Sequence, residues 1–370
     1  MKNINKIYIR SDVIYTLFIP LIIIGKLVRF TIMKEVLVDE GIGHGMLEQA
    51  LNGGSASGEA PGIFMSQIIW FLSLFGFNTY LQFEFFFTVV WNILVLLMLF
   101  KMKKYLTIMQ AIFITFSIMI LNIFSFTLSK EPVQMLFFIL VYLILLSEKP
   151  SYKAKLIGIA AVMLLASVTF RSYYILIVYF MAVAQFVFII LKNKNMKMIT
   201  IGAIFLIIAG TSYFAILNLA DLVNHSNVDE LIRVRATTRG SAATVIAPSI
   251  RTDNYFFMSV NYVLVLLRML FPLELLRLGL KYIPYVLYQL LITWVFFLSF
   301  KRYNVNSPAV NLAMIIYFAF LCCSATFEPD FGSWVRHESV VFPVILLMTG
   351  IKGVLINGGR DTRDTSPACL

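Results

Sequence analysis

Residues 173–191 read YYILIVYFMAVAQFVFIIL, a segment without a charged side chain. An α-helix of this length crosses a hydrocarbon core of about 30 Å. Because lipid offers no hydrogen-bond partners to the backbone, a segment that spans it must be helical. Two further apolar segments, 62–77 and 256–271, are ambiguous. Similar long segments recur along the chain, at 13–32, 80–100, 106–124, 133–147, 156–170, 198–219, 282–300, 309–326 and 339–356.

The composition agrees with these segments. Of the 370 residues, 60% are hydrophobic and 13% are charged, whereas an ordinary soluble domain has about 45–50% and about 25%. A soluble protein of this size would lack the polar surface needed to cover its core. An aromatic content of 15% is the opposite of a disordered composition. The sequence therefore predicts an all-α polytopic membrane helix bundle.

The basic residues predict the orientation of the chain. Cytoplasmic loops of membrane proteins are enriched in Lys and Arg, which explains the net charge of +11 without a nucleic-acid partner. One set of segments holds 17 of the 30 basic residues and 4 of the 19 acids. We expect this set to be cytoplasmic: 1–12, 101–104, 148–155, 192–197, 301–302 and 352–364.

Alternation then places a second set of loops outside. This works only if neither 62–77 nor 256–281 crosses the membrane, so we expect a membrane-parallel or re-entrant helix after the first outer loop. The result is about ten transmembrane helices with both termini cytoplasmic, and twelve crossings remain the alternative. We expect one membrane domain, 1–356, followed by a disordered cytoplasmic tail, 357–370. The outer loops are 33–61, 125–132, the hinge at 171, 220–255 and 327–338.

Two outer loops carry candidate acids. Asp39 and Glu40 are adjacent carboxylates that follow the first helix, an arrangement that serves a general base or holds a cation. The alternative is a solvated loop. Ser129 is a candidate N-cap for the next helix, and Glu131 suits the positive start of that helix. Lys130 is not explained by capping, and we expect it to pair with Glu131 or to meet an anion.

Arginine is the second kind of candidate. Arg171 stands alone between two apolar segments, where it either snorkels to lipid headgroups or clamps a phosphate. Arg239 belongs to a loop that also holds Arg233 and Arg235, which form either an anion site or a solvated loop.

The stretch 327–338 combines acids, Arg, His and aromatic rings before the last apolar segment. Trp334 is a candidate membrane-interface residue. No metal-ligand spacing accompanies the three histidines of the chain, so we expect no metal and no other cofactor, with a divalent cation at the two acids of the first loop as the alternative. The candidates of this stretch are Glu328, Asp330, Trp334, Arg336 and His337.

Three of these places give the chain a family resemblance. They are Asp39-Glu40 after the first helix, Ser129-Lys130-Glu131 at the start of a middle helix, and Gly332-Ser-Trp-Val-Arg336 before a late helix. In these motifs and in topology the chain resembles membrane glycosyltransferases of the GT-C type and the related Wzy-type polysaccharide polymerases. The resemblance implies a sugar donor on a polyprenyl phosphate or diphosphate, at the outer face of a bacterial plasma membrane, in capsule, exopolysaccharide or O-antigen synthesis.

The resemblance also implies roles for the candidates. Asp39 would be the base, with Glu40 as its substitute and His337 as an alternative base. Polymerase and single-sugar transferase remain open, and other polysaccharide-assembly membrane proteins are expected partners. A transporter or flippase for lipid-linked oligosaccharides is the competing function, although the repeated halves typical of transporters are not evident. Phosphate contacts would come from Lys130, Arg171, Arg239 and Arg336, and sugar contacts or orienting contacts from Glu131, Glu328, Asp330 and Trp334.

Overall fold

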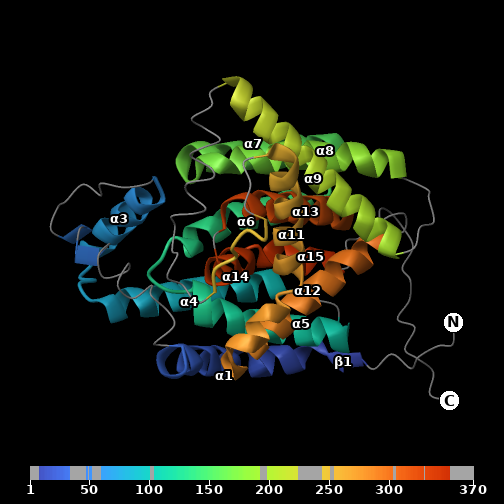
Figure 1. Cartoon of the computed structure of the whole chain (residues 1–370). Helices are drawn as coiled ribbons and strands as arrows, with labels where there is room; N and C mark the ends of the chain where they lie inside the picture. The colour runs from blue at the N-terminus through green and yellow to red at the C-terminus, as the bar shows by residue number, and fades with distance from the viewer. Residues whose placement is uncertain are drawn as a thin grey trace, which may run out of the picture.

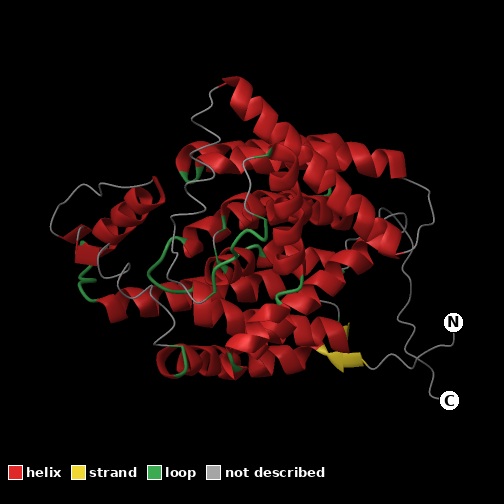
Figure 2. Ribbon diagram, viewed as in Figure 1, coloured by secondary structure: helices red, strands yellow, loops and turns green. Residues whose placement is uncertain are grey.

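The computed structural model confirms an all-α helix bundle, as the red ribbons of Figure 2 show. The only strands in the described part of the chain are two short segments that pair antiparallel, β1 (Tyr8–Arg10) and β2 (Tyr105–Thr107). The structure describes residues 8–33, 47–48, 50–51, 60–100, 104–191, 198–223, 244–250, 254–302, 306–328 and 330–350.

Within these ranges, eight helical segments are long and apolar enough to cross a membrane. Two of them include a short turn of a different helix type, and one continues into a π-helix. They are α1 (Ser11–Thr31), α4 (Tyr80–Leu99), α5 (Ile108–Ile120) with the π-helix η1 (Leu121–Ser125), α7 (Tyr152–Thr169), η2 (Ser172–Tyr174) with α8 (Ile175–Leu191), α9 (Met198–Val223), η4 (Leu280–Tyr282) with α12 (Ile283–Lys301), and α13 (Pro308–Phe327).

The remaining helices are shorter than these eight, and two of them correspond to expected spans. The expected span 133–147 is a helix of 16 residues. Of the expected span 339–356, the described part forms a helix of seven residues, and positions 351–356 lie outside the described residues, as does the expected tail. The short helices are α3 (Ala60–Ser73), α6 (Glu131–Leu146), α11 (Tyr255–Leu270), α14 (Phe331–Ser339) and α15 (Phe342–Met348), with the 3-10 turn η3 (Leu273–Leu278) between α11 and α12.

Both ambiguous segments are short helices. Helix α3 has 14 residues and helix α11 has 16, and neither reaches the length of the eight candidate spans. In Figure 1, α3 stands apart from the bundle at the left of the view, whereas α11 lies across its front. Tyr262 of α11 is fully buried and stacks on Tyr213 of α9, with 4.2 Å between the ring centroids.

Helix α13 forms the centre of the bundle. Every residue from Ala309 to Thr326 is buried, so this helix is surrounded by protein, whereas the outer helices expose Leu, Ile and Phe side chains. Cys322 and Cys323 are buried here as free cysteines, as the apolar segment predicts. A helix buried on all sides carries no amphipathic pattern, and its apolar residues therefore say nothing about which face meets a neighbour.

The helix starts follow local sequence signals. Thr79 with Gln82, and Thr107 with Gln110, each form a reciprocal capping box, in which side chain and backbone satisfy each other's hydrogen bonds. At α6 the expected N-cap was wrong by one residue, because Lys130 occupies that position without a side-chain cap.

Candidate functional site

The site is organised by α14, which was expected to be a loop and is a buried helix of nine residues. Asp330 is its N-cap and accepts hydrogen bonds from Ser333, from N at 2.8 Å and from Oγ at 3.0 Å. Phe331, the residue after Asp330, donates from its backbone N to the carbonyl oxygen of Thr244 at 3.0 Å, which ties α14 to a distant part of the sequence. This packing holds Arg336 and His337 inside the molecule, with side chains largely buried.

His337 is the centre of the cluster. Its Nδ1 lies 2.5 Å from Oε1 of Glu328, at the end of α13. Its Nε2 lies 2.9 Å from Nη2 of Arg171, in the turn between α7 and α8. Because a guanidinium only donates, Nε2 accepts and Nδ1 carries the hydrogen that Glu328 accepts. The imidazole is thus oriented by a carboxylate, the arrangement that prepares a histidine for proton transfer.

Glu131 joins the second arginine to this group. Its Oε1 lies 3.5 Å from His337 Nε2 and 3.7 Å from Arg336 Nε. Its Oε2 is buried and has no hydrogen-bond partner among the residues that the structure describes. Arg336 also donates from Nη2 to Ser333 Oγ at 3.4 Å. The carboxylate of Glu131 therefore links Arg336 to His337.

The cluster holds two arginines and two carboxylates. Arg171 and Arg336 lie near the carboxylates of Glu131 and Glu328, with His337 among them. Burial alone would raise the pKa of Glu328, but His337 and the two arginines lower it below its usual value. An incoming anion must therefore compete with these carboxylates for the arginines.

Aromatic rings fix the position of Arg171. Its guanidinium carbon lies 5.5 Å and 5.6 Å from the ring centroids of Phe170 and Tyr173, a favourable cation–π distance. Tyr173 accepts a hydrogen bond from Arg171 and stacks on Phe327 at 4.5 Å. Arg171 and Lys130 are only partly buried. The cluster is therefore accessible from the side on which these residues lie.

The structure thus brings together candidates from three predicted outer segments, namely 125–132, the hinge at 171 and 327–338. The contacts join Arg171, Arg336, His337, Glu131 and Glu328. Asp330 contributes indirectly, because it caps α14.

The sequence analysis proposed Trp334 as a membrane-interface residue, but the structure places it in the core, outside this cluster. It is fully buried, donates from Nε1 to Gln289 Oε1 at 3.2 Å and packs against Phe320. Asp39, Glu40 and Arg239 lie outside the described residues.

The structure adds a second group of charges, at α1 and α4, that was not among the site candidates. Lys26 Nζ lies 2.7 Å from Glu84 Oε1, and Arg29 Nε lies 3.3 Å from the same oxygen. The two cations also donate to carbonyl groups of the π-helix and the residue after it, Arg29 to Ile123 O at 2.8 Å and Lys26 to Phe126 O at 2.6 Å. Charges inside apolar segments are costly and call for partners, a signal that pointed to these three residues.

The π-helix η1 connects the two charged groups. On its other side, Ser125 Oγ lies 2.5 Å from Ser339 Oγ and 3.4 Å from the carbonyl oxygen of Arg336. The carbonyl ends of a helix favour cations, so Lys26 and Arg29 stabilise the segment on which α14 rests. Nothing in the residue types of 121–125 predicts a π-helix.

Among the described residues, no group of three or more His, Cys, Asp or Glu could hold a metal ion. The alternative cation site at Asp39 and Glu40 lies outside those residues. Comparisons of the chain with protein-family models, with curated proteins and with solved structures find no match. The function is therefore argued from this chain's own residues.

Proposed function

We propose that the protein is a membrane glycosyltransferase, of the polysaccharide polymerase or single-sugar type, that acts on polyprenyl-phosphate-linked or polyprenyl-diphosphate-linked sugars. The proposal rests on one observation above all: Arg171, Arg336 and His337 meet around two buried carboxylates. We place the reaction at the outer face of a bacterial plasma membrane, with both termini cytoplasmic, since the Lys-rich loops favour that orientation.

The residue types match the chemistry of such a transfer. An acceptor hydroxyl oxygen bonds to the anomeric carbon of the donor, while the bond from that carbon to the phosphate oxygen breaks. The hydroxyl proton goes to a base, and the polyprenyl phosphate or diphosphate departs with the bonding electron pair. Guanidinium groups stabilise the negative charge that develops on the leaving group.

His337 has the geometry of a general base, but the nitrogen that would take up the proton, Nε2, already has a partner. Arg171 donates to Nε2 in the structure. A phosphate that attracts this guanidinium would release Nε2 to accept the proton, while Glu328 retains the hydrogen bond at Nδ1. The free Oε2 of Glu131 would accept a hydrogen bond from a sugar hydroxyl. Asp39, with Glu40 as its substitute, remains the leading candidate base.

A transporter or flippase for the same lipid-linked saccharides is the second candidate. The observation that favours it is the ion cluster of Lys26, Arg29 and Glu84, which lies within two candidate membrane spans. Intramembrane charges of this kind line transport pathways in many carriers. Loss of a flippase would leave the saccharide on the cytoplasmic leaflet, whereas loss of a polymerase would leave single repeat units on the outer leaflet.

The test replaces Arg336 by Ala and Asp39 by Asn in cells that have no other copy, at matched membrane levels. We expect short lipid-linked saccharides to accumulate and polymer to fall in both variants. The control is Arg10→Ala, whose side chain is exposed and pairs with nearby Asp12. Unchanged polymer in both variants would show that this site assignment is wrong.

A further inference from the structure

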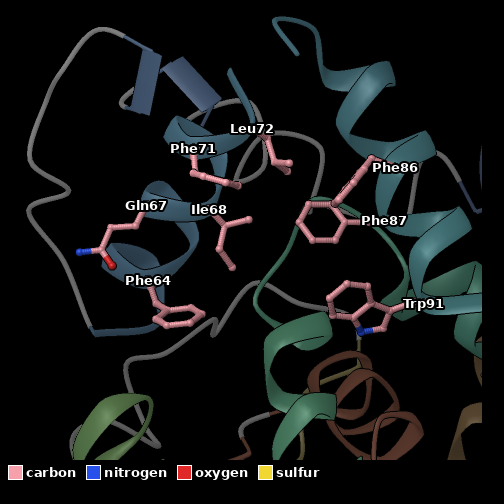
Figure 3. A pocket seen from close by; sticks show the side chains of 8 residues that line it. All are labelled: Phe64, Gln67, Ile68, Phe71, Leu72, Phe86, Phe87 and Trp91. Carbon is pink, nitrogen blue, oxygen red and sulfur yellow. The ribbon is translucent and has the colours of Figure 1, made fainter. Parts of the chain in front are cut away.

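Two cavities of the protein differ in the charge of their walls. Figure 3 shows a groove in which Phe64 and Phe71 of α3 face Phe87 and Trp91 of α4. None of the described side chains that line this groove is charged, so nothing in its wall selects an occupant. The second cavity has a volume of about 540 Å³, within the range of about 300–1,000 Å³ typical of small-molecule sites, and Arg302 lies in its wall.

We call the second cavity the β2 pocket, because its wall runs from the end of β2 into α5 and is completed by the ends of α12 and α15 and the start of α13. Hydrogen bonds tie these elements together. Gln110 Nε2 donates to the carbonyl oxygen of Thr349 at 2.8 Å, and Ser299 Oγ donates to that of Met348 at 3.0 Å. Asn306 Nδ2 donates to the carbonyl oxygen of Ser299 at 2.8 Å. The pocket is therefore preorganised.

The pocket is apolar at one end and polar at the other. Trp294 of α12 lines it, is 52% exposed and lies inside a candidate membrane span. Met109 of α5 also lines it and is 41% exposed. Arg302 directly follows the end of the α12 span, about 12 Å further along the helix axis than Trp294. The pocket therefore reaches from the apolar medium to the level of the lipid headgroups.

The charge of the pocket is positive. Arg302 is exposed, no described acid lines the pocket, and none of the ion pairs among the described residues involves this arginine. Residues 301–302 and 101–104, the latter ending just before β2, belong to the basic segments expected to be cytoplasmic. The cytoplasmic leaflet carries anionic lipids, and basic pockets between membrane helices bind lipid headgroups on that side.

We propose that the β2 pocket binds an acidic phospholipid of the cytoplasmic leaflet, with its phosphate at Arg302 and an acyl chain beside Trp294 and Met109. Charge complementarity selects this occupant. A zwitterionic lipid brings its own cation, which repels the guanidinium, and a soluble phosphate gains nothing from the apolar wall. The lipid joins the ends of α5, α12 and α15, and a ligand that binds only the folded state stabilises it. None of the described residues proposed for sugar transfer lines this pocket, so the inference is independent of the proposed function.

The experiment places the full-length protein in nanodiscs of phosphatidylcholine with a small fraction of phosphatidylglycerol that carries a diazirine on its acyl chain. After irradiation, mass spectrometry identifies the labelled peptides, and titration of the phosphatidylglycerol fraction gives an apparent Kd. We expect labelling within 107–110 and 294–302. Arg302→Ala should raise the apparent Kd about tenfold, as expected for the loss of a charge-assisted contact. Lys301→Ala should leave it unchanged and is the matched control, because Lys301 is exposed, carries the same charge and does not line the pocket.

A second pair of variants tests the apolar wall. Met109→Trp fills the pocket and should raise the apparent Kd by a similar factor. Ile112→Trp is its control, because Ile112 lies on the same helix, is 38% exposed and does not line the pocket. Phosphatidylglycerol should also raise the unfolding temperature of the unmodified protein but not that of the Arg302→Ala variant.

Several results would overturn the proposal. Labelling confined to other peptides would place the lipid elsewhere, and equal labelling by a diazirine phosphatidylcholine would remove the selection by charge. An equal effect of Lys301→Ala would show general attraction to the bilayer surface. Displacement of the lipid by inorganic phosphate at matched concentration would assign the pocket to a soluble anion. No sugar transfer is measured, so none of these results bears on the proposed function.

Discussion

At the scale of single residues, two glutamates of one short stretch are in opposite states. Glu328 is held ionised by His337 and the arginines, as described above. Glu338 is fully buried, and its Oε1 accepts from Tyr317 at 2.6 Å and from Gln289 at 3.0 Å. Burial raises the pKa of Glu338 to about 8. Environments that push the pKa values of two carboxyl groups apart are typical of functional sites. Here they give one charged partner for His337 and one neutral group in the core.

The neutral state of Glu338 predicts a pH dependence of stability. The folded state retains a proton that the unfolded state, with an ordinary pKa of 4.5, releases. The contribution of protonated Glu338 to the free energy of unfolding is therefore fully present below about pH 4.5, and it is lost as the pH rises toward 8. Glu338→Gln, which cannot ionise, should remove that part of the slope. The measurement is thermal unfolding in detergent from pH 5 to about pH 8, and equal slopes for the two proteins would contradict the assignment.

Glu328 predicts an effect on catalysis. Glu328→Gln removes the carboxylate that orients His337 and should lower the turnover of sugar transfer by about 100-fold, within the range for a general-base system. It should also shift the pH profile, which a purely structural defect would not do. Glu148→Gln is the control, because Glu148 is exposed. A profile and rate like those of the control would exclude His337 as a participant.

At the scale of elements, α1 and α5 approach closely at a glycine. A Cβ atom on Gly25 would lie 2.9 Å from Asn122 Cβ and 3.1 Å from the carbonyl oxygen of Met119. Asn122 and Asn92 exchange hydrogen bonds at 2.8 and 3.0 Å, so the neighbouring side chain is held in place. This contact positions α1, and with it Lys26 and Arg29, against the π-helix.

Gly25→Ala should therefore destabilise the protein. Overpacking of this kind costs about 1–3 kcal/mol, against a gain in helix propensity of about 1 kcal/mol. Gly158→Ala in α7 is the matched control, because the nearest atoms, on Ile144, lie at 3.6 and 3.7 Å. Thermal unfolding of both variants is the measurement, and a Gly25 variant as stable as the Gly158 variant would refute the close approach.

The elements also show how far the sequence predicts the fold. The long apolar segments predict the candidate spans because hydrophobicity and length act locally. Helix α14 was misjudged because its polar side chains face other buried polar groups rather than water, so its polar composition resembled that of a solvated loop. The cluster itself joins Glu131, Arg171 and His337, which are far apart in sequence, so only tertiary packing brings them together. The outer position that alternation gave to their segments was the one signal that they meet.

At the scale of the whole molecule, the two ends of the bundle differ. At one end, β1 pairs with β2 beside Lys104, whose carbonyl oxygen accepts a hydrogen bond from Ser11 N at 2.9 Å. In Figure 1, β1 lies at the right of the view and α3 at the left. The positive-inside rule predicts that these ends lie on opposite sides of the membrane.

Single cysteines test this orientation in a variant with Cys369 replaced by Ser, since Cys322 and Cys323 are buried. Asn78→Cys, next to α3, should react with a membrane-impermeant maleimide in intact spheroplasts. Lys149→Cys should react only after the membrane is opened. Both replaced side chains are exposed, so access alone decides the result. The reverse pattern would invert the topology and place the cluster on the cytoplasmic side.

The central claim is that the arginines around His337 hold the phosphate of a lipid-linked sugar. Its most direct measurement is sugar transfer from a polyprenyl-diphosphate-linked saccharide by the purified protein in nanodiscs. Arg171→Ala and Arg336→Ala, each shown to unfold at the temperature of the unmodified protein, should lower kcat/KM by about 100-fold or more. Transfer at an unchanged rate in both variants would contradict the claim.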